Sequence, residues 1–240
     1  MFQFILDMIY PVRCPICDDI VLPKGLRICP ACRMKLEYIG EPRCKKCSKP
    51  IEFEEQEYCS DCVKKQFHYK KGYSIWIYND SMKKSIAYFK YHGRREYSVF
   101  YIQEMVKHYG EQIIRLAPDV IVPIPLHRSR EAHRGYNQAD ILAKGIGREL
   151  HIPVASKLLV RNKKTVPQKQ LSDKQRLQNL QRAFRYNNEV ATKYKREIKR
   201  VVIVDDIYTT GSTIEACTNV LLEHGIKEVY FITLCIGKGF

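Results

Sequence analysis

The chain has 240 residues, of which 45% are hydrophobic and 28% are charged, and its formal net charge at pH 7 is +15. These values allow one large domain or two smaller ones with a substantial core, and they exclude a mainly disordered chain. No apolar run approaches the roughly 18 residues that a membrane-spanning helix needs. The segment Met1–Ile9 is apolar but lacks a basic leader and a small-residue cleavage site. We therefore expect a short amphipathic helix there and a cytoplasmic protein.

Eight of the ten cysteines form four Cys-x-x-Cys pairs whose first members recur every fifteen residues. The pairs are Cys14/Cys17, Cys29/Cys32, Cys44/Cys47 and Cys59/Cys62. Two residues between the thiols allow both sulfurs to reach one tetrahedral ion at about 2.3 Å. The spacing therefore predicts two structural Cys₄ zinc sites in a small domain over residues 1–68.

Other uses of these cysteines remain open at this stage. A disulfide framework is disfavoured by the lack of a secretory leader, and an iron–sulfur cluster is disfavoured by the regular short pairs. Pairing of neighbouring Cys-x-x-Cys pairs would give two zinc ribbons with short local loops, whereas alternate pairing would give a cross-brace. Bound thiolates would make this region acidic, which is unsuited to electrostatic binding of nucleic acid. Cys217 and Cys235 lie in apolar segments and are expected in the core.

After the cysteine pairs, alternating strand and helix patterns predict an α/β domain over residues 69–240 with a parallel sheet covered on both faces. We expect strands at 73–78, 119–124, 152–160, 200–204 and 228–236. We expect helices from the cap residues Asn79, Asp80 and Ser81 to Phe89, from Val106 to Leu116, at 135–150, and at 213–224 before Gly225.

Basic side chains concentrate just before the last two strands. Residues 161–200 carry 13 basic and 3 acidic side chains, whereas residues 1–62 carry 9 and 10. Such a segment suits a pyrophosphate or a polyanion such as DNA, or serves only solubility.

The most informative segment runs from Val201 to Thr213. Its aliphatic run Val201–Val204 predicts a strand buried on both faces, and Asp205 and Asp206 follow at the carboxyl end, where open α/β sheets bind ligands. The small-residue loop after them opens a helix, so backbone N–H groups and the helix dipole can hold an anion. The segment predicts a sugar-phosphate site, although the two acids could instead merely cap the helix.

This segment resembles the ligand signature of type I phosphoribosyltransferases, which use phosphoribosyl pyrophosphate (PRPP). The resemblance implies that Asp205 and Asp206 hold the ribose hydroxyls at the catalytic centre. It assigns the 5′-phosphate to Thr209, Thr210, Gly211, Ser212 and Thr213. Ser212 stands where many members have glycine. The resemblance also implies a pyrophosphate loop after strand 119–124, where Arg128 and Arg134 suit phosphate oxygens, and a mobile loop with Gln168, Arg176 and Asn179.

The zinc pattern, Val122-Pro-Ile-Pro-Leu126, Arg134-Gly-Tyr-Asn-Gln138 and Val204–Thr213 together resemble the ComF (ComFC) family over essentially the whole chain. Members are phosphoribosyltransferase-like proteins of natural competence. The resemblance implies PRPP and Mg²⁺ as ligands, handling of single-stranded DNA during uptake, and a DNA-uptake helicase and other competence proteins as partners. The stretches His68–Trp76 and Phe89–Tyr97 interleave cations with aromatics, as in strand-binding surfaces, although both patterns also fit ordinary core residues beside solvated lysines.

Three alternatives are kept beside this interpretation. The first is a nucleobase salvage phosphoribosyltransferase, which needs a base pocket. The second is a DNA-binding protein with a vestigial ligand site, and the third is a zinc-scaffold adaptor for a DNA-uptake helicase. Whether PRPP is turned over is open.

Overall fold

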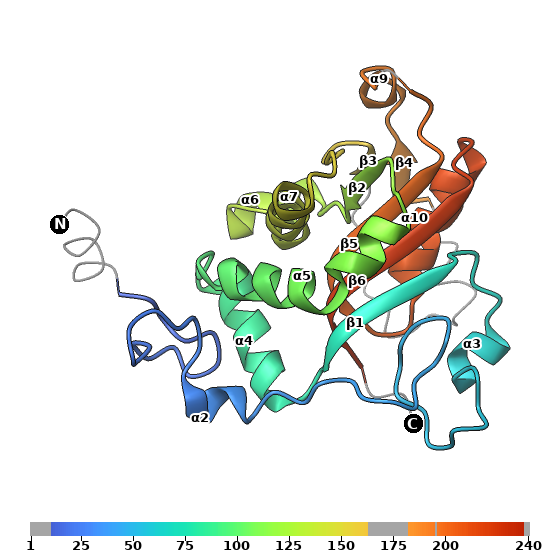
Figure 1. Cartoon of the computed structure of the whole chain (residues 1–240). Helices are drawn as coiled ribbons and strands as arrows, with labels where there is room; N and C mark the ends of the chain where they lie inside the picture. The colour runs from blue at the N-terminus through green and yellow to red at the C-terminus, as the bar shows by residue number, and fades with distance from the viewer. Residues whose placement is uncertain (1–10, 163–181, 195, 238–240) are drawn as a thin grey trace.

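The computed structural model describes residues 11–162, 182–194 and 196–237, and it shows an α/β unit with two cysteine-rich ribbons along one side (Figure 1). The central sheet has four parallel strands in the order β1-β6-β5-β2. Its strands are β1 (Lys71–Ile77), β2 (Val120–Pro123), β5 (Arg200–Tyr208) and β6 (Glu228–Ile236). The predicted parallel sheet is confirmed.

Helices cover both faces of this sheet. The long helices are α4 (Asp80–Tyr91), α5 (Tyr97–Arg115), α7 (Gln138–Leu150) and α10 (Ser212–Glu223). Successive side chains of a strand point to opposite faces. Val202 and Ile232 therefore pack with residues of α4, α5 and α7, whereas Val201 and Phe231 pack with residues of α10. The two hydrophobic clusters make a three-layer arrangement, which is why the strands of the sheet are apolar along most of their length.

Side-chain caps and left-handed residues set where the helices begin and end. The Asn79 side chain accepts a hydrogen bond from the Met82 N–H at the start of α4, as its position predicted. The helix expected at 135–150 begins only at Gln138, because Gly135 has a φ of 75° and the Asn137 side chain caps α7. Gly225, with a φ of 91°, follows the end of α10.

Two expectations for the segment between β2 and β5 are wrong. The strand expected at 152–160 is divided: Val154 makes one parallel bridge to Ile121, and a turn then leads to β3 (Leu159–Arg161), which pairs antiparallel with β4 (Phe184–Tyr186). The Leu158 N–H bonds to the Ala155 carbonyl within that turn, so the chain leaves the sheet there. The arginine-rich segment expected as a loop forms α6 (Arg128–Arg134), and α9 (Asn188–Ala191) follows β4.

The two ribbons are repeats of one structure. The Cys14 N–H donates to the Asp19 carbonyl at 2.8 Å, and the Cys44 N–H donates to the Lys49 carbonyl at 2.8 Å. The residue that follows each first Cys-x-x-Cys pair, Asp18 or Ser48, has a φ of 67°. Each ribbon also carries a short helix at its second pair, α2 (Pro30–Arg33) or α3 (Ser60–Lys64).

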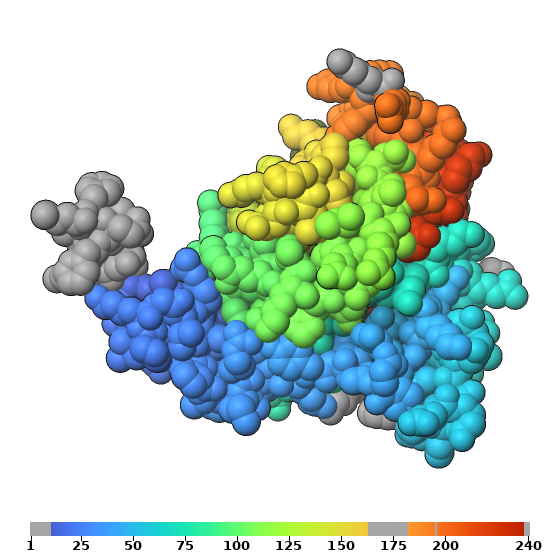
Figure 2. Space-filling model, viewed as in Figure 1, coloured from blue at the N-terminus to red at the C-terminus, as the bar shows by residue number. Residues whose placement is uncertain are grey.

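The ribbons pack on the α/β unit rather than projecting from it. Cys14 belongs to the hydrophobic cluster on the α4 and α5 face, and Cys44 belongs to the cluster on the α10 face. Between the ribbons, the Ile39 N–H donates to the Ile75 carbonyl at 2.9 Å, so this connection covers the free edge of β1. Figure 2 shows the described residues of the two ribbons, coloured blue to cyan, spread along one side of the molecule. The domain limits 1–68 and 69–240 stay a prediction.

Within the described part of the chain, the helices lack either the length or the apolar character needed to cross a bilayer.

Candidate functional site

Asp205 and Asp206 lie in the C-terminal half of the strand β5, toward the carboxyl end of the sheet. Asp205 and Asp206 line a cavity of about 160 Å³, and the Asp206 N–H donates to the Asp205 carboxylate at 2.9 Å. Side chains from α4, α6, α7, β3 and α10 line the same cavity. They include Lys90, Arg130, Arg134, Gln138, Arg161 and Thr213. The strand runs on to Tyr208, so β5 is four residues longer than the sequence pattern predicted.

A lysine from α4 neutralises part of this acid pair. The Lys90 ammonium lies 2.5 Å from Oδ2 of Asp206, and its side chain is only 17% exposed. Burial alone would lower the pKa of this lysine, but the Asp206 carboxylate outweighs burial and raises the pKa of Lys90. The lysine is therefore charged.

Asp205 has an unusual proton affinity. Removal of its carboxyl group from water is the main cause, and the neighbouring Asp206 carboxylate adds to it; together they raise the pKa of Asp205 to about 7. The Lys90 charge acts in the opposite direction. A carboxyl group that changes charge near neutral pH can bind a ligand hydroxyl in a pH-dependent way.

The predicted phosphate loop lies between β5 and α10. Thr209 and Thr210 are exposed in the turn, Gly211 caps α10 with a φ of 79°, and Ser212 and Thr213 begin the helix. The Thr210 and Ser212 hydroxyl groups are 3.0 Å apart. The turn gives backbone N–H groups and hydroxyls next to the positive end of a helix, the combination that binds phosphate in many proteins.

The arginines of α6 divide between two cavities. Arg134 faces the acid pair, where its guanidinium donates to the Gln138 Oε1 at 3.0 Å and to the Tyr91 hydroxyl at 2.9 Å. Arg130 lines this cavity as well, whereas Arg128 lines a neighbouring cavity of about 600 Å³. Of the two arginines expected to hold pyrophosphate, the structure thus brings only Arg134 to the acid pair, together with Arg130.

Other predicted residues lie elsewhere or outside the structure. Gln168, Arg176 and Asn179 fall outside the described residues. Lys90 and Gln138 also belong to the site, and the sequence pattern does not predict either of them, although Lys90 lies within Phe89–Tyr97 and Gln138 within Arg134–Gln138. Alternation of cations with aromatics marked the segment of Lys90, but no periodicity indicated that its ammonium reaches β5.

The aromatic residues of the two expected strand-binding stretches are mostly core residues. Tyr69, Tyr73 and Trp76 are buried in the first stretch, and Phe89 and Tyr97 are buried in the second. Their rings are therefore closed to base stacking, which supports the core alternative for these five residues. Tyr91 is 59% exposed, and the Arg134 guanidinium lies 4.7 Å from its ring centroid. One exposed contact between a cation and an aromatic ring, that of Arg134 with Tyr91, therefore lies beside the acid pair.

The eight cysteines of the Cys-x-x-Cys pairs form two clusters that fit zinc. Neighbouring pairs come together, with Cys14, Cys17, Cys29 and Cys32 in one cluster and Cys44, Cys47, Cys59 and Cys62 in the other. A tetrahedral ion at about 2.3 Å from each sulfur holds sulfurs about 3.8 Å apart. The observed Cys17–Cys29 and Cys47–Cys59 sulfur distances are 3.9 and 3.6 Å. The ribbon pairing is confirmed and the cross-brace is wrong.

Cys217 and Cys235 are fully buried and lie in the hydrophobic clusters, as expected. Burial raises the pKa of both thiols well above its usual value, so they remain protonated core residues.

Comparison with known proteins agrees with both parts of the structure. Residues 5–63 match the double zinc ribbon domain, and residues 101–239 match the phosphoribosyl transferase domain. Competence protein F of Haemophilus influenzae is 30% identical over 84% of this chain and 87% of its own, and competence protein ComFC of Bacillus subtilis is 29% identical over 90% and 91%. DNA utilization protein YhgH of Escherichia coli is 38% identical over 49% of each chain. The chain belongs to the ComF/ComFC family, and in this chain a double zinc ribbon domain precedes a phosphoribosyl transferase domain.

Proposed function

We propose that this protein binds PRPP together with Mg²⁺ and handles incoming single-stranded DNA during natural transformation. The observation that carries the proposal is the placement of the Asp205–Asp206 pair and Thr213 of the phosphate loop on one small cavity, which basic side chains also line. A carboxylate pair accepts from two neighbouring hydroxyls, and a helix start binds a phosphate. A ribose phosphate presents both groups at once.

The proposed roles follow from the chemistry of each group. Asp205 and Asp206 accept from the ribose hydroxyls, and the turn from Thr209 to Thr213 donates to the 5′-phosphate. Arg134 and Arg130 face the departing pyrophosphate, for which a guanidinium gives two parallel hydrogen bonds. As pyrophosphate leaves C1′, the two carboxylates favour the positive charge that builds on the ribose.

Mg²⁺ prefers oxygen ligands, and here it would bind mainly to the phosphates and hydroxyls of PRPP and to water. When bound, it neutralises the pyrophosphate oxygens. Lys90 supplies part of the positive charge from the chain itself.

Titration calorimetry with PRPP and Mg²⁺ tests the ligand assignment. We expect binding by the wild-type chain and none by an Asp205→Ala, Asp206→Ala variant. An Asp140→Ala variant is the matched control, because Asp140 lines only the neighbouring cavity and pairs with Lys144. Equal binding by all three proteins would sink the assignment.

The proposed role with DNA is supported by the outward face of α4. The Tyr88 and His92 rings stack with centroids 4.7 Å apart, and the Lys84 ammonium lies 5.8 Å from the Tyr88 ring centroid. Tyr91 lies about one helical turn after Tyr88 in α4, and its side chain is exposed. Bases stack on such rings while cations follow the backbone. The relatives' names, competence and DNA utilization proteins, agree with this role.

Fluorescence anisotropy with a labelled oligonucleotide tests the DNA role. We expect salt-dependent binding to single strands that falls several-fold in a Tyr88→Ala, Tyr91→Ala variant. A Tyr58→Ala variant, which removes an exposed tyrosine of the second ribbon, should bind as the wild type does. If both variants bind as tightly as the wild type, α4 is not the DNA surface.

One observation favours the alternative of a salvage phosphoribosyltransferase. The cavity of about 600 Å³ shares Pro125, Leu126, Asn137 and Arg161 with the acid-pair cavity and gives space for an acceptor base. A pyrophosphate release assay with PRPP and Mg²⁺ decides between the two. Release that requires a free base supports the salvage enzyme, and release that requires single-stranded DNA supports action on the nucleic acid.

A further inference from the structure

We propose that Tyr69 and His68 are positioning residues. Their contacts connect the second cysteine site to the phosphate loop and hold the loop in place. Zinc binding at Cys44, Cys47, Cys59 and Cys62 and ligand binding at the loop then favour each other, whereas the first site is independent. The inference rests on the proposed binding of a phosphorylated ligand at this loop.

The first support is a line of polar contacts from a metal ligand to β5. The Tyr69 hydroxyl lies 4.0 Å from the Cys62 sulfur and 2.8 Å from the Tyr208 hydroxyl. Tyr69 and Tyr208 are 0% and 1% exposed, so water cannot replace either partner. A zinc-bound thiolate is an acceptor, which orients the Tyr69 hydroxyl toward sulfur and leaves its oxygen to accept from Tyr208.

The second support is packing directly beneath the loop. A Cβ atom added to Gly211 would overlap the Tyr208 hydroxyl and would lie 2.9 Å from the Phe67 ring. The two aromatic residues therefore touch the left-handed glycine that caps α10. Phe67 stacks on Tyr69 with ring centroids 5.2 Å apart, so one aromatic group joins the ribbon to the loop.

The third support is a buried carboxylate in the first turn of α10. Glu215 is 2% exposed and accepts from the His68 backbone N–H at 2.9 Å, and it also pairs with the His68 ring. The segment that leaves Cys62 is thereby fixed to the helix whose start forms the phosphate site.

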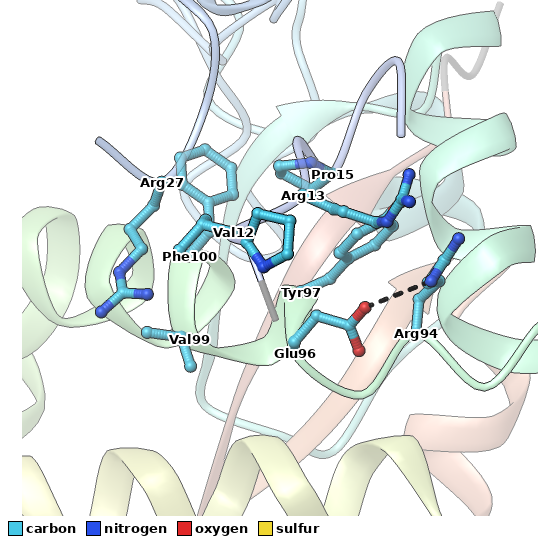
Figure 3. Close-up of a pocket in the computed structure, with 10 residues that line it drawn as sticks. Val12, Arg13, Pro15, Arg27, Arg94, Glu96, Tyr97, Val99 and Phe100 are labelled. Atoms are coloured by element: carbon cyan, nitrogen blue, oxygen red, sulfur yellow. Dashed lines mark ion pairs between the residues drawn. The ribbon is translucent and has the colours of Figure 1, made fainter. Parts of the chain in front are cut away.

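The first ribbon has a comparable anchor, but it reaches a different part of the fold. There the Asp18 carboxylate accepts from the hydroxyl of Tyr97, the first residue of α5, at 2.6 Å, and from Arg94, just before that helix, at 2.7 Å. Arg94 and Tyr97 also line a cavity of about 560 Å³ with Arg13, as Figure 3 shows. That cavity shares no described lining residue with the acid-pair cavity. A buried tyrosine hydroxyl at each ribbon gives a matched pair for experiment.

When two ligands favour the same conformation of a protein, each raises the affinity for the other by the same factor. We expect PRPP with Mg²⁺ to raise the affinity for one of the two zinc ions, measured by equilibrium competition with a chromogenic chelator, by about five-fold or more. In a Tyr69→Phe, Tyr208→Phe variant, both hydroxyls are removed together so that neither is left buried alone. This variant should lose the effect of PRPP on zinc affinity and, with zinc bound, should bind PRPP more weakly by the same factor.

The Tyr97→Phe variant is the control, since it removes the equivalent hydroxyl at the first ribbon. It should keep both the PRPP affinity and the effect of PRPP on zinc affinity. Thermal unfolding of both variants separates the coupling from a simple loss of stability, because a merely structural role would lower the melting temperature and leave the reciprocal effect intact.

Amide hydrogen exchange of residues 209–213 without any ligand gives an independent measurement. We expect faster exchange in the Tyr69→Phe, Tyr208→Phe variant and unchanged exchange in Tyr97→Phe. Unchanged exchange in the double variant overturns the inference, whether or not PRPP binds. Failure of the wild-type chain to bind PRPP, with faster loop exchange in the double variant, overturns the ligand assignment and leaves the structural coupling supported.

Discussion

The ammonium of Lys90, at the end of α4, lies 2.5 Å from the Asp206 carboxylate at the end of β5. A cation supplied by the chain thus contacts the acid pair before any ligand does. Because Lys90 is almost buried, this attraction is poorly screened by water and salt. The contact links α4 to the carboxyl end of the sheet and controls the charge of the site.

Replacement of Lys90 by methionine should shift the pH at which PRPP binds. The Lys90 charge acts to lower the pKa of Asp205, so its loss should raise that pKa and move the midpoint of binding upward by about one pH unit. Calorimetry between pH 6 and 9 measures the midpoint. Lys84→Met is the control, because Lys84 is an exposed residue of the same helix. An identical midpoint in Lys90→Met and the wild type would contradict the prediction.

The wild-type affinity for PRPP should rise with pH through about 7. Asp205 has a pKa of about 7, so it loses its proton in this range and becomes a better acceptor for a ribose hydroxyl. The effect on stability has the opposite sign. A carboxyl group whose pKa is higher in the folded state than in the unfolded chain destabilises the fold progressively as pH rises from about 4 through 7.

An Asp205→Asn variant separates these effects from titration of the ligand itself. Its residual PRPP binding should vary with pH only as the phosphates of PRPP do, and its melting temperature should depend less on pH between 4 and 7. A wild-type profile that superimposes on that of Asp205→Asn would show that Asp205 does not titrate in this range.

Gly211→Ala should abolish ligand binding and cost more stability than other left-handed glycines do. The φ of 79° alone costs an alanine about 1 kcal/mol, and overlap with Tyr208 and Phe67 adds about 1–3 kcal/mol. Gly225→Ala is the control, because Gly225 has a φ of 91° and no atom within 4 Å of an added Cβ. Urea unfolding and PRPP calorimetry on both variants measure the difference. Equal losses of stability would mean that the space beside Gly211 can adapt.

Metal analysis should find two zinc ions per chain. Cys47→Ser should reduce the zinc content to about one, because a three-thiolate site binds the ion less tightly. Cys217→Ala should leave two, since that thiol lies in the α10 cluster rather than in a cysteine site. Loss of both ions from Cys47→Ser would show that the two ribbons do not fold independently of each other.

Patterns of short range in the sequence predicted much of this structure. The Cys-x-x-Cys spacing predicted metal binding, because two cysteines separated by two residues can bind one ion with both sulfurs. Apolar runs predicted β5 and β6, and Asn79 and Gly225 predicted the limits of helices. The strand expected at 152–160 was wrong because the chain turns away after Ala155 to form a hairpin with β4, which depends on residues far along the chain.

The sequence by itself determined the four Cys-x-x-Cys pairs, the parallel sheet and the acid pair beside a glycine turn, since each depends on neighbouring residues and their periodicity. Tertiary structure decided which Cys-x-x-Cys pairs share a Cys₄ site. It also decided that Lys90 meets Asp206, that Arg130 rather than Arg128 joins Arg134 at the cavity, and that Tyr69 joins the second ribbon to Tyr208. These contacts depend on the crossing of helices and strands distant in sequence. Side-chain periodicity indicates which face of an element is buried, but not which residue of another element it meets.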